Sequence, residues 1–327
     1  MRTVVINRNG GPDVLELEDR PVPKPGRGQL CVDVAAAGVN YRDVYEREGT
    51  GGYGGPPPIL AGIEGAGRVS AIGDDVEGFA VGDRVAWMSA AGSYAEQVLV
   101  TAAKTVKVPA GLAPETAAAA MMQGITAQYL ATSCCPVHVG DTVLIHAAAG
   151  GVGGLLTQVV KLLGGHVIAT ASSEEKRAAA LANGAGYAID YPDFAGRVLE
   201  LTGGQGVEVV FDGVGAATVD GSLACLKPRG TLVLTGTASG PVPSIDVGRM
   251  AAKALFFTRP GLAHYTASAD ELNERAAAVF GWIASGALKV RIGGRFALDY
   301  AREAHRALEA RRTLGKLVLL PGPGRWG

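Results

Sequence analysis

Apolar and polar positions follow two different patterns along the 327 residues of the chain. In the first third, short apolar runs such as LCVDVAAAGV at residues 30–39 and GAGRVSAIG at residues 65–73 are separated by glycine and proline. This pattern is typical of strands in a compact, irregular β-domain. The sequence GTGGYGGPPP at residues 49–58 predicts a mobile loop and a candidate lid, because glycine is entropically costly to order and proline lacks an amide donor.

After about residue 121, apolar runs of strand length alternate with helical patterns. Such alternation predicts a parallel, doubly wound α/β sheet. The expected strands number six, which fits one dinucleotide-binding sheet. They cover residues 142–146, 166–170, 186–190, 207–212, 231–236 and 254–259.

The tail from about residue 262 leaves this alternation. It contains helical patterns at residues 267–286 and 295–312, followed by the apolar run KLVLLP. We expect the tail to pack onto the first domain, so that the nucleotide domain is an insertion. The predicted domains are a β-rich catalytic domain, residues 1–121 plus 262–327, and a dinucleotide-binding domain, residues 122–261.

Composition limits the classes of partner. The net charge is −1 and 19% of residues are charged, so no broad basic surface for nucleic acid or an anionic membrane is indicated. The N-terminus lacks the apolar core of a signal peptide, and no stretch is long and apolar enough to span a bilayer, which favours a cytoplasmic protein. The four cysteines do not have zinc-ligand spacing and are expected to be free thiols.

A glycine-rich turn follows the first strand of the alternating region. The sequence TVLIHAAAGGVGGLL places Gly150, Gly151, Val152 and Gly153 between a strand and an apolar helix. A pyrophosphate needs close backbone approach and free amides at such a point. A strict G-x-G-x-x-G pattern is absent, and a tight strand-to-helix turn would also explain the glycines. The further strand and helix units favour nucleotide binding.

The residues at the end of the second strand indicate whether the site prefers NADH or NADPH. An NAD site usually has Asp or Glu there, whereas this chain continues Thr170, Ala171, Ser172, Ser173. Ser172, Ser173 and Lys176 could donate hydrogen bonds to a 2′-phosphate, so NADPH is favoured over NADH. Alternatively, Ser172 and the glutamate three residues later form a helix capping box, and Lys176 is a solvated helix residue.

Several segments together resemble the zeta-crystallin-like quinone oxidoreductase branch of the zinc-independent medium-chain dehydrogenase/reductase superfamily. They include GVNYRDVYEREG, GIEGAGRVSAIGDDVEGFAVGDRV, MMQGITAQYL, HAAAGGVG, FDGVG, FFTRP and ARRTLGKLVLLP, in that order. The resemblance implies a GroES-like catalytic domain, completed by the tail, around an inserted Rossmann domain. It also implies a homodimer joined through the sheet edge ALFFTRP, although that segment could be an ordinary buried strand.

The resemblance also bears on metal binding. Zinc alcohol dehydrogenases of the superfamily bind the catalytic metal with a cysteine and a His-Glu pair, where this chain has Asn40 and Ile63-Glu64. It also lacks the closely spaced cysteines of their structural zinc lobe. We therefore expect no metal, and a structural role for Glu64.

The resemblance assigns further cofactor contacts. The residues implied around the nicotinamide are Asn40, Tyr45, Gln123 and Thr126, with Phe257, Thr258 and Arg259 bordering its cleft. Tyr191 is implied against the adenine, and Arg311 or Arg312 reaches the cofactor from the tail. Each has an alternative interpretation: the tyrosines could pack, Asn40 could serve a turn, and Arg311 could be a solvated helix end.

These features predict an NADPH-dependent quinone oxidoreductase. Hydride transfer requires a positioned nicotinamide and an apolar slot for a flat acceptor. Asn40 and Tyr41 are the side chains expected to stabilise the developing oxyanion. Alternatives are a reductase of enone or enoyl C=C bonds, or a non-catalytic NADPH-binding protein of the crystallin-like or RNA-binding kind, although the net charge argues against RNA.

Overall fold

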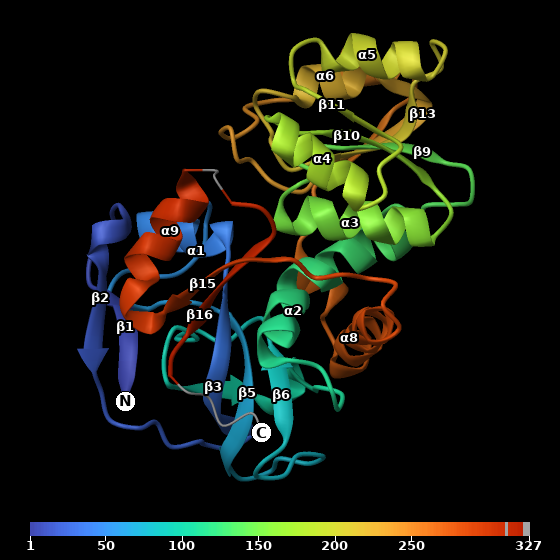
Figure 1. Cartoon of the computed structure of the whole chain (residues 1–327). Helices are drawn as coiled ribbons and strands as arrows, with labels where there is room; N and C mark the ends of the chain where they lie inside the picture. The colour runs from blue at the N-terminus through green and yellow to red at the C-terminus, as the bar shows by residue number, and fades with distance from the viewer. Residues whose placement is uncertain (311–312, 323–327) are drawn as a thin grey trace. The chain divides into compact units, whose positions relative to one another are not determined.

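The computed structural model describes residues 1–310 and 313–322 and divides into two units (Figure 1). The first comprises Met1–Ile125, Thr266–Ser285 and Val290–Gly327, and the second Thr126–Tyr265 and Gly286–Lys289. These limits differ by a few residues from the boundaries expected at 121 and 262. Gly286–Lys289 group with the second unit, where the Gln158 side chain bonds the backbone N–H and C=O of Lys289 at 2.8 and 3.1 Å.

The second unit contains the predicted doubly wound parallel sheet. All six expected strands are present within the described residues, and all the neighbouring pairs are parallel. The spatial order is β11-β10-β9-β12-β13-β14. The bounds are β9 (Thr142–Ile145), β10 (His166–Thr170), β11 (Tyr187–Ile189), β12 (Val207–Asp212), β13 (Leu226–Leu234) and β14 (Phe256–Thr258).

Helices cover both faces of this sheet, which is why its central strands are apolar on both sides. Leu144, Val210 and Leu232 are fully buried on neighbouring strands. Figure 1 shows α3 and α4 on one face and α5 and α6 on the other. The helices are α3 (Gly151–Leu162), α4 (Glu174–Ala182), α5 (Phe194–Leu201), α6 (Val219–Ala224) and the short α7 (Val247–Ala251).

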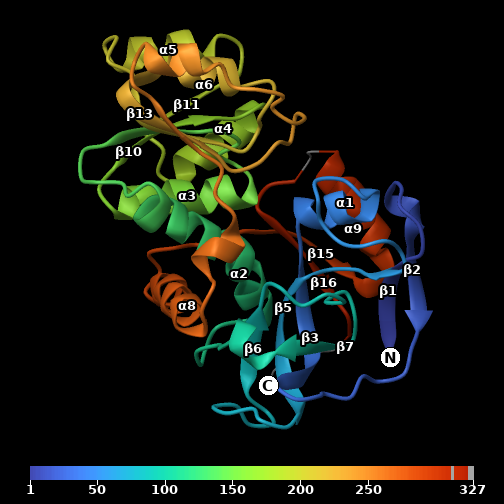
Figure 2. The ribbon, with the colours of Figure 1, turned by 180° about the vertical axis from the view of Figure 1, so that it is seen from behind.

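The first unit is rich in antiparallel sheet, as its short apolar runs predicted. A small sheet has the order β2-β1-β4, and a larger one the order β15-β16-β3-β5-β6-β8, with β7 beside β3 (Figure 2). The tail strand β16 pairs with β3, so the tail adds a strand to the sheet of this unit. The strands are β1 (Arg2–Ile6), β2 (Leu15–Asp19), β3 (Gln29–Val39), β4 (Ile59–Leu60), β5 (Glu64–Ile72), β6 (Arg84–Trp87), β7 (Gln97–Thr101), β8 (Thr105–Lys107), β15 (Ile292–Ala297) and β16 (Lys316–Leu320).

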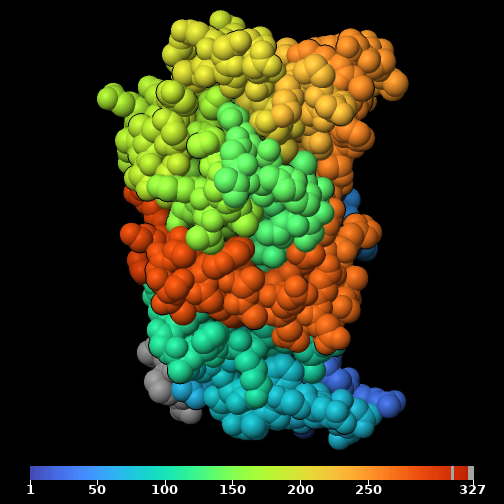
Figure 3. All heavy atoms as spheres, turned by 90° about the vertical axis from the view of Figure 1, so that its right-hand side faces the viewer, coloured from blue at the N-terminus to red at the C-terminus, as the bar shows by residue number. Residues whose placement is uncertain are grey.

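The helices of the first unit lie beside this sheet. They are α1 (Tyr41–Glu48), α8 (Ala269–Ala284), α9 (Ala301–Glu309) and the first part of α2 (Pro114–Tyr129), which crosses the boundary between the units. One side of α8 is buried through Leu272, Ala276 and Val279, and its other side contributes to the orange part of the orange-to-red band in Figure 3.

One expected helix is shorter than its pattern indicated. Residues 295–312 were predicted to be helical, but Arg295–Ala297 belong to β15, and the helix begins at Ala301. The strand alternates half-buried and exposed residues along Ile292–Ala297 and pairs in parallel with β16. Pairing with a strand that the same tail supplies therefore outweighs the local helical pattern.

Candidate functional site

The glycine turn lies at the start of helix α3. Gly150 is the N-cap of α3, and Gly151, Val152 and Gly153 form its first turn. The amide groups of a first helical turn have no carbonyl one turn earlier to bond, and the helix dipole makes this end favourable for an anion. A side chain at Gly153 would place its Cβ 2.6 Å from the Ala147 carbonyl oxygen. Glycine therefore allows the helix to start directly against the turn.

Tyr191 lies at the same turn. The Ala147 amide donates to the Tyr191 hydroxyl at 3.1 Å, and Ala147 has a positive φ of 51°. The Tyr191 ring lies nearly parallel to His146, with centroids 6.0 Å apart. The residue expected against the adenine is thus half-buried in the unit that carries the glycine turn, where it contacts the start of that turn.

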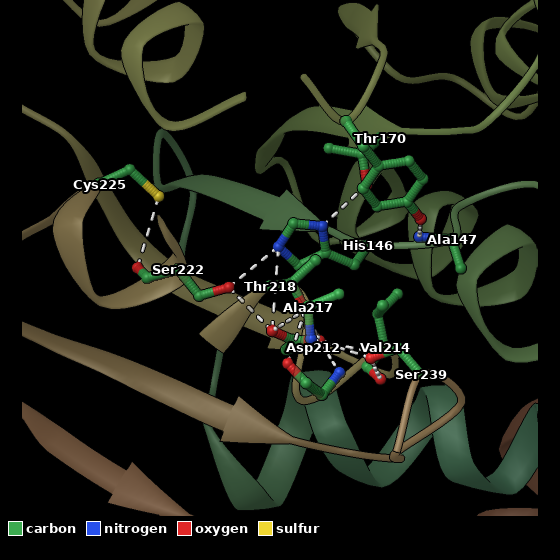
Figure 4. A network of polar contacts seen from close by, with 12 residues as sticks. His146, Ala147, Thr170, Asp212, Val214, Ala217, Thr218, Ser222, Cys225 and Ser239 are labelled. Carbon is green, nitrogen blue, oxygen red and sulfur yellow. Dashed lines mark hydrogen bonds and ion pairs between the residues drawn. The ribbon is translucent and has the colours of Figure 1, made fainter. Parts of the chain in front are cut away.

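A buried network joins the ends of three strands below this turn (Figure 4). Thr170 Oγ1 lies 2.8 Å from His146 Nδ1, and His146 Nε2 lies 3.0 Å from Ser222 Oγ. Ser222 donates its only proton to Asp212 at 2.8 Å, so His146 must donate from Nε2 and accept from Thr170 at Nδ1. Burial lowers the pKa of His146 to about 4, which keeps the ring neutral.

Asp212 is the acceptor at the end of this chain of hydrogen bonds. Its fully buried carboxylate also accepts from the amides of Val214 and Gly215 at 2.8 and 3.0 Å, and from the Thr218 hydroxyl. The carboxylate therefore orders the turn that follows β12. We did not predict this network from the sequence, although His146 and Asp212 end adjacent parallel strands and FDGVG was among the matched segments.

The end of β10 presents the expected serines. Ser172 and Ser173 are exposed and Lys176 is half-buried. The capping-box interpretation of Ser172 is wrong, because α4 begins at Glu174 and its N-cap is Ser173, whose Oγ accepts from the Lys176 amide at 3.3 Å. The cap lies one residue later than the spacing suggested, so Ser172 does not cap the helix.

In the first unit, Asn40 belongs to a buried charged cluster. Its Nδ2 donates to Glu64 Oε2 at 2.8 Å, and its Oδ1 accepts from Lys316 Nζ at 2.6 Å. Lys316 also contacts Glu64 Oε2 at 2.5 Å, and Glu64 Oε1 accepts from the Met122 amide at 2.5 Å. Lys316 and Glu64 are 1% and 0% exposed. The predicted structural role of Glu64 therefore includes a partner, Lys316, that the sequence did not reveal.

The helix that follows Asn40 carries the two predicted tyrosines. Asn40 is the N-cap of α1, and its backbone amide donates to Asp43 Oδ2 at 2.8 Å. Burial raises the pKa of Asp43 to about 7, despite the hydrogen bond that it accepts from Tyr94. Tyr41 and Tyr45 are half-buried, with ring centroids 6.0 Å apart.

The remaining predicted cofactor contacts divide between the two units. Gln123 is half-buried on the part of α2 in the first unit, and Thr126 is half-buried at the start of the second. Phe257 and Thr258 lie on β14, followed by exposed Arg259. Arg311 lies outside the described residues.

The alternative reading of the FFTRP segment as an ordinary buried strand is wrong. β14 is the last strand of the sheet and pairs only with β13 among the described strands. Phe256 is 61% exposed and Phe257 is 38% exposed. An apolar strand therefore stands at an open sheet edge.

The described residues contain neither a membrane-spanning helix nor a cluster of metal-ligating side chains. Within residues 1–310 and 313–322, no helix is both long enough and apolar enough to cross a membrane. In the same residues, no group of three or more His, Cys, Asp or Glu side chains is placed to bind a metal ion. The Lys316 ammonium contacts both Asn40 and Glu64.

Segments of both units match families of known proteins. Residues 26–110 match the alcohol dehydrogenase GroES-like domain, and residues 151–274 match the family named zinc-binding dehydrogenase. A Pseudomonas aeruginosa protein named quinone oxidoreductase is 44% identical over 95% of this chain and 97% of its own length. A 2-haloacrylate reductase of Burkholderia sp. is 40% identical over 97% of this chain and 98% of its own. A mycobacterial structure complexed with NADPH has 48% identity and a TM-score of 0.95, covering 98% of this chain and all of the other.

Proposed function

The chain belongs to the quinone oxidoreductase family of the medium-chain dehydrogenase/reductase superfamily, and we propose that it transfers hydride from NADPH to a quinone without a metal. The observation that carries this proposal is the glycine turn at the start of α3, next to a β10 end without a carboxylate. The first feature suits a pyrophosphate and the second suits a 2′-phosphate. A related protein is crystallised with NADPH.

Different groups of residues would bind the different parts of the cofactor. The first-turn amides of α3, at Gly151, Val152 and Gly153, would bind the pyrophosphate, with Gly150 at the cap. Ser172, Ser173 and Lys176 would bind the 2′-phosphate, and Tyr191 would pack on the adenine. The residues proposed for the nicotinamide end are Asn40, Tyr45, Gln123, Thr126, Phe257, Thr258 and Arg259. Arg311 would reach the cofactor from the tail.

In this reading, the first unit is the catalytic domain and the second the dinucleotide-binding domain. When bound, NADPH supplies the hydride. The protein has to orient the acceptor and stabilise the negative charge that develops on its oxygen, and a fixed hydrogen-bond donor does this most effectively in a water-excluded site. We assign this role to the Asn40 amide, which is 5% exposed, and to the Tyr41 hydroxyl. A quinone oxyanion needs no strong acid, since water or a polar side chain can protonate it.

The cluster around Asn40 supports a metal-free reaction. Where a zinc enzyme of the superfamily has metal ligands, this chain has an amide and a glutamate already bonded to the Lys316 ammonium. An ammonium and a divalent cation would compete for the same two oxygens. The positive charge at this position therefore comes from the protein.

We also propose that the chain is a cytoplasmic homodimer. The exposed phenylalanines of β14 lie on the open edge of a sheet, and such edges readily pair with another strand. Pairing two copies through β14 would cover this apolar edge and join the two nucleotide sheets.

The experiment that tests the function follows the loss of NADPH absorbance with a panel of quinones, a panel of enones and an NADH control. We expect quinone-dependent oxidation with NADPH preferred. Oxidation with enones alone would assign the chain to C=C reduction. Tight NADPH binding without turnover on either panel would indicate the non-catalytic binding role, and preference for NADH would contradict the assignment of Ser172, Ser173 and Lys176.

Reduction of a conjugated C=C bond is a second candidate for a specific reason. One relative that matches nearly the whole chain is named 2-haloacrylate reductase, and an acrylate carries a C=C bond conjugated with a carboxylate. Hydride addition to an enone also places negative charge on a conjugated oxygen. The same amide and hydroxyl would stabilise that charge, so the acceptor panel is needed to separate the two reactions.

A further inference from the structure

We propose that Lys316 is a positioning residue for the reaction: its ammonium, together with Glu64, fixes the Asn40 amide in one orientation and polarises it as a hydrogen-bond donor. This inference rests on the proposed function, in which Asn40 stabilises the oxyanion. It adds a residue from the last strand of the chain, which lies 276 positions from Asn40 in the sequence. The three side chains are called the Asn40 cluster below.

Burial makes the contacts of the Asn40 cluster obligatory. The Lys316 side chain is 1% exposed and the Glu64 side chain 0% exposed. A lone charge at such a depth is strongly unfavourable, whereas a hydrogen-bonded pair is tolerated. Lys316 contacts Glu64 Oε2 at 2.5 Å, and the Met122 amide bonds the other carboxylate oxygen at 2.5 Å. Both ends of the Glu64 carboxylate are thereby fixed by β16 and α2.

The pair determines which way the Asn40 amide faces. An ammonium has only donors and a carboxylate only acceptors. The amide oxygen must therefore face Lys316, at 2.6 Å, and the amide nitrogen must face Glu64, at 2.8 Å. A flipped amide would set N–H against ammonium and carbonyl against carboxylate, which would break both bonds.

One N–H of the Asn40 amide has only a weak partner among the described residues, and we assign it to the ligand. Besides Glu64, the described residues offer the Asn40 Nδ2 the Gly38 carbonyl at 3.5 Å, which is too long for a strong hydrogen bond. An ammonium on the amide oxygen withdraws electron density from the nitrogen, and chains of hydrogen bonds strengthen one another in this way. Lys316 therefore makes the remaining N–H a better donor to an oxyanion.

Gly38 makes room for this arrangement. A Cβ at position 38 would lie 2.3 Å from Glu64 Oε2 and 2.8 Å from Lys316 Cε. The strand β3 can therefore pass beside the ion pair only with glycine at this point. Gly38 and Asn40, at the start of the segment GVNYRDVYEREG, thus supply the space and the amide of the Asn40 cluster.

The first test observes the amide directly by NMR of the full-length chain. The Asn40 side-chain NH2 signals are identified by their loss in Asn40→Leu. We expect Lys316→Met to shift them, because the charged partner of the amide oxygen is removed. Lys104→Met, which removes a lysine bonded to the Thr266 and Ala267 carbonyls in the same unit, should leave them in place. Unchanged Asn40 signals in Lys316→Met would overturn the positioning role, whatever reaction the protein catalyses.

The second test is kinetic. We expect Lys316→Met to lower kcat by about tenfold or more while KM for NADPH changes by less than about twofold, because a transition-state interaction is weakened. In an Asn40→Leu background, Lys316→Met should lower kcat by less than about twofold further, because a residue that acts through Asn40 has nothing left to position. Equal losses in both backgrounds would refute action through Asn40.

A double variant separates positioning from stability. Lys316→Met alone leaves Glu64 buried and unpaired, so its Tm should fall; adding Glu64→Gln removes that charge and should raise Tm again. We expect kcat to remain low in the Lys316→Met/Glu64→Gln protein. Recovery of kcat together with Tm would show a purely structural role. A wild-type chain that reduces neither quinones nor enones would instead overturn the proposed function, and the kinetic part of this inference with it.

Discussion

Replacing Gly153 by alanine tests the assignment of the cofactor turn most directly. The new Cβ would lie 2.6 Å from the Ala147 carbonyl oxygen and 2.9 Å from Ala148 Cα. Both are backbone atoms, so no side-chain rotation can relieve the contact. The first turn of α3 has to move away from the strand end by roughly half an ångström or more to approach an ordinary van der Waals separation.

That displacement is large for a hydrogen bond. An N–H···O bond of about 2.9 Å that lengthens to about 3.4 Å is largely lost. A bond between an amide and a charged group contributes about 1.5–3 kcal/mol. Loss of one such bond to the pyrophosphate would therefore raise the Kd for NADPH by about 10- to 100-fold. Gly150→Ala should cost less, because its Cβ would lie 3.2 Å from the same carbonyl oxygen.

The assay is titration of the protein with NADPH by calorimetry, with Tm recorded for each variant. Gly281→Ala is the matched control, because Gly281 is exposed on α8 and a Cβ there has no heavy atom within 4 Å. It should bind NADPH as the wild type does. Wild-type affinity in a folded Gly153→Ala protein would refute the assignment of this turn to the pyrophosphate.

Three further predictions concern specificity, stability and assembly. Ser172→Asp should raise the Kd for NADPH about 30-fold and change the Kd for NADH little, because a carboxylate about 5 Å from a 2′-phosphate costs roughly 2 kcal/mol. Equal effects on both cofactors would contradict the proposed 2′-phosphate site. Burial lowers the pKa of His146 to about 4, so the unfolded chain binds a proton at a higher pH than the folded chain does. The free energy of unfolding should therefore fall by up to roughly 3 kcal/mol as the pH drops from about 6.5 towards 4. His146→Asn should flatten this part of a Tm profile, and an unchanged slope would refute the cause. Phe256→Glu should yield monomers in sedimentation velocity, whereas a persistent dimer would exclude the β14 edge.

The sequence predicted the nucleotide-binding sheet almost strand for strand. Its central strands are buried on both faces, so each appears as a mainly apolar run whose limits depend little on distant contacts. The β10 strand, for example, occupies residues 166–170 as expected. The glycine turn was also predictable, because its geometry is set by the adjoining strand and helix.

Local patterns misled where a partner elsewhere in the chain decides the structure. Arg295–Ala297 continued a helical pattern but form a strand, because β16 provides a parallel neighbour. Ser172 and Glu175 had capping-box spacing, but the helix starts one residue later and Ser173 is the cap. Helix and strand limits depend on such pairing and capping competitions, which a pattern alone does not resolve.

In the candidate site, too, some features follow from the sequence alone and others from tertiary contacts. The sequence by itself determined the glycine turn, the absence of a carboxylate at the tip of β10, and the presence of Asn40 and Ile63 in place of two metal ligands, since these depend only on which residue types stand at given positions. Only the tertiary structure decided what those residues touch. Lys316 reaches Asn40 and Glu64 because β16 folds back beside β3, and His146 shares its proton network with Asp212 because β9 and β12 are neighbours. A buried polar group must find a partner, but the sheet pairing selects which one.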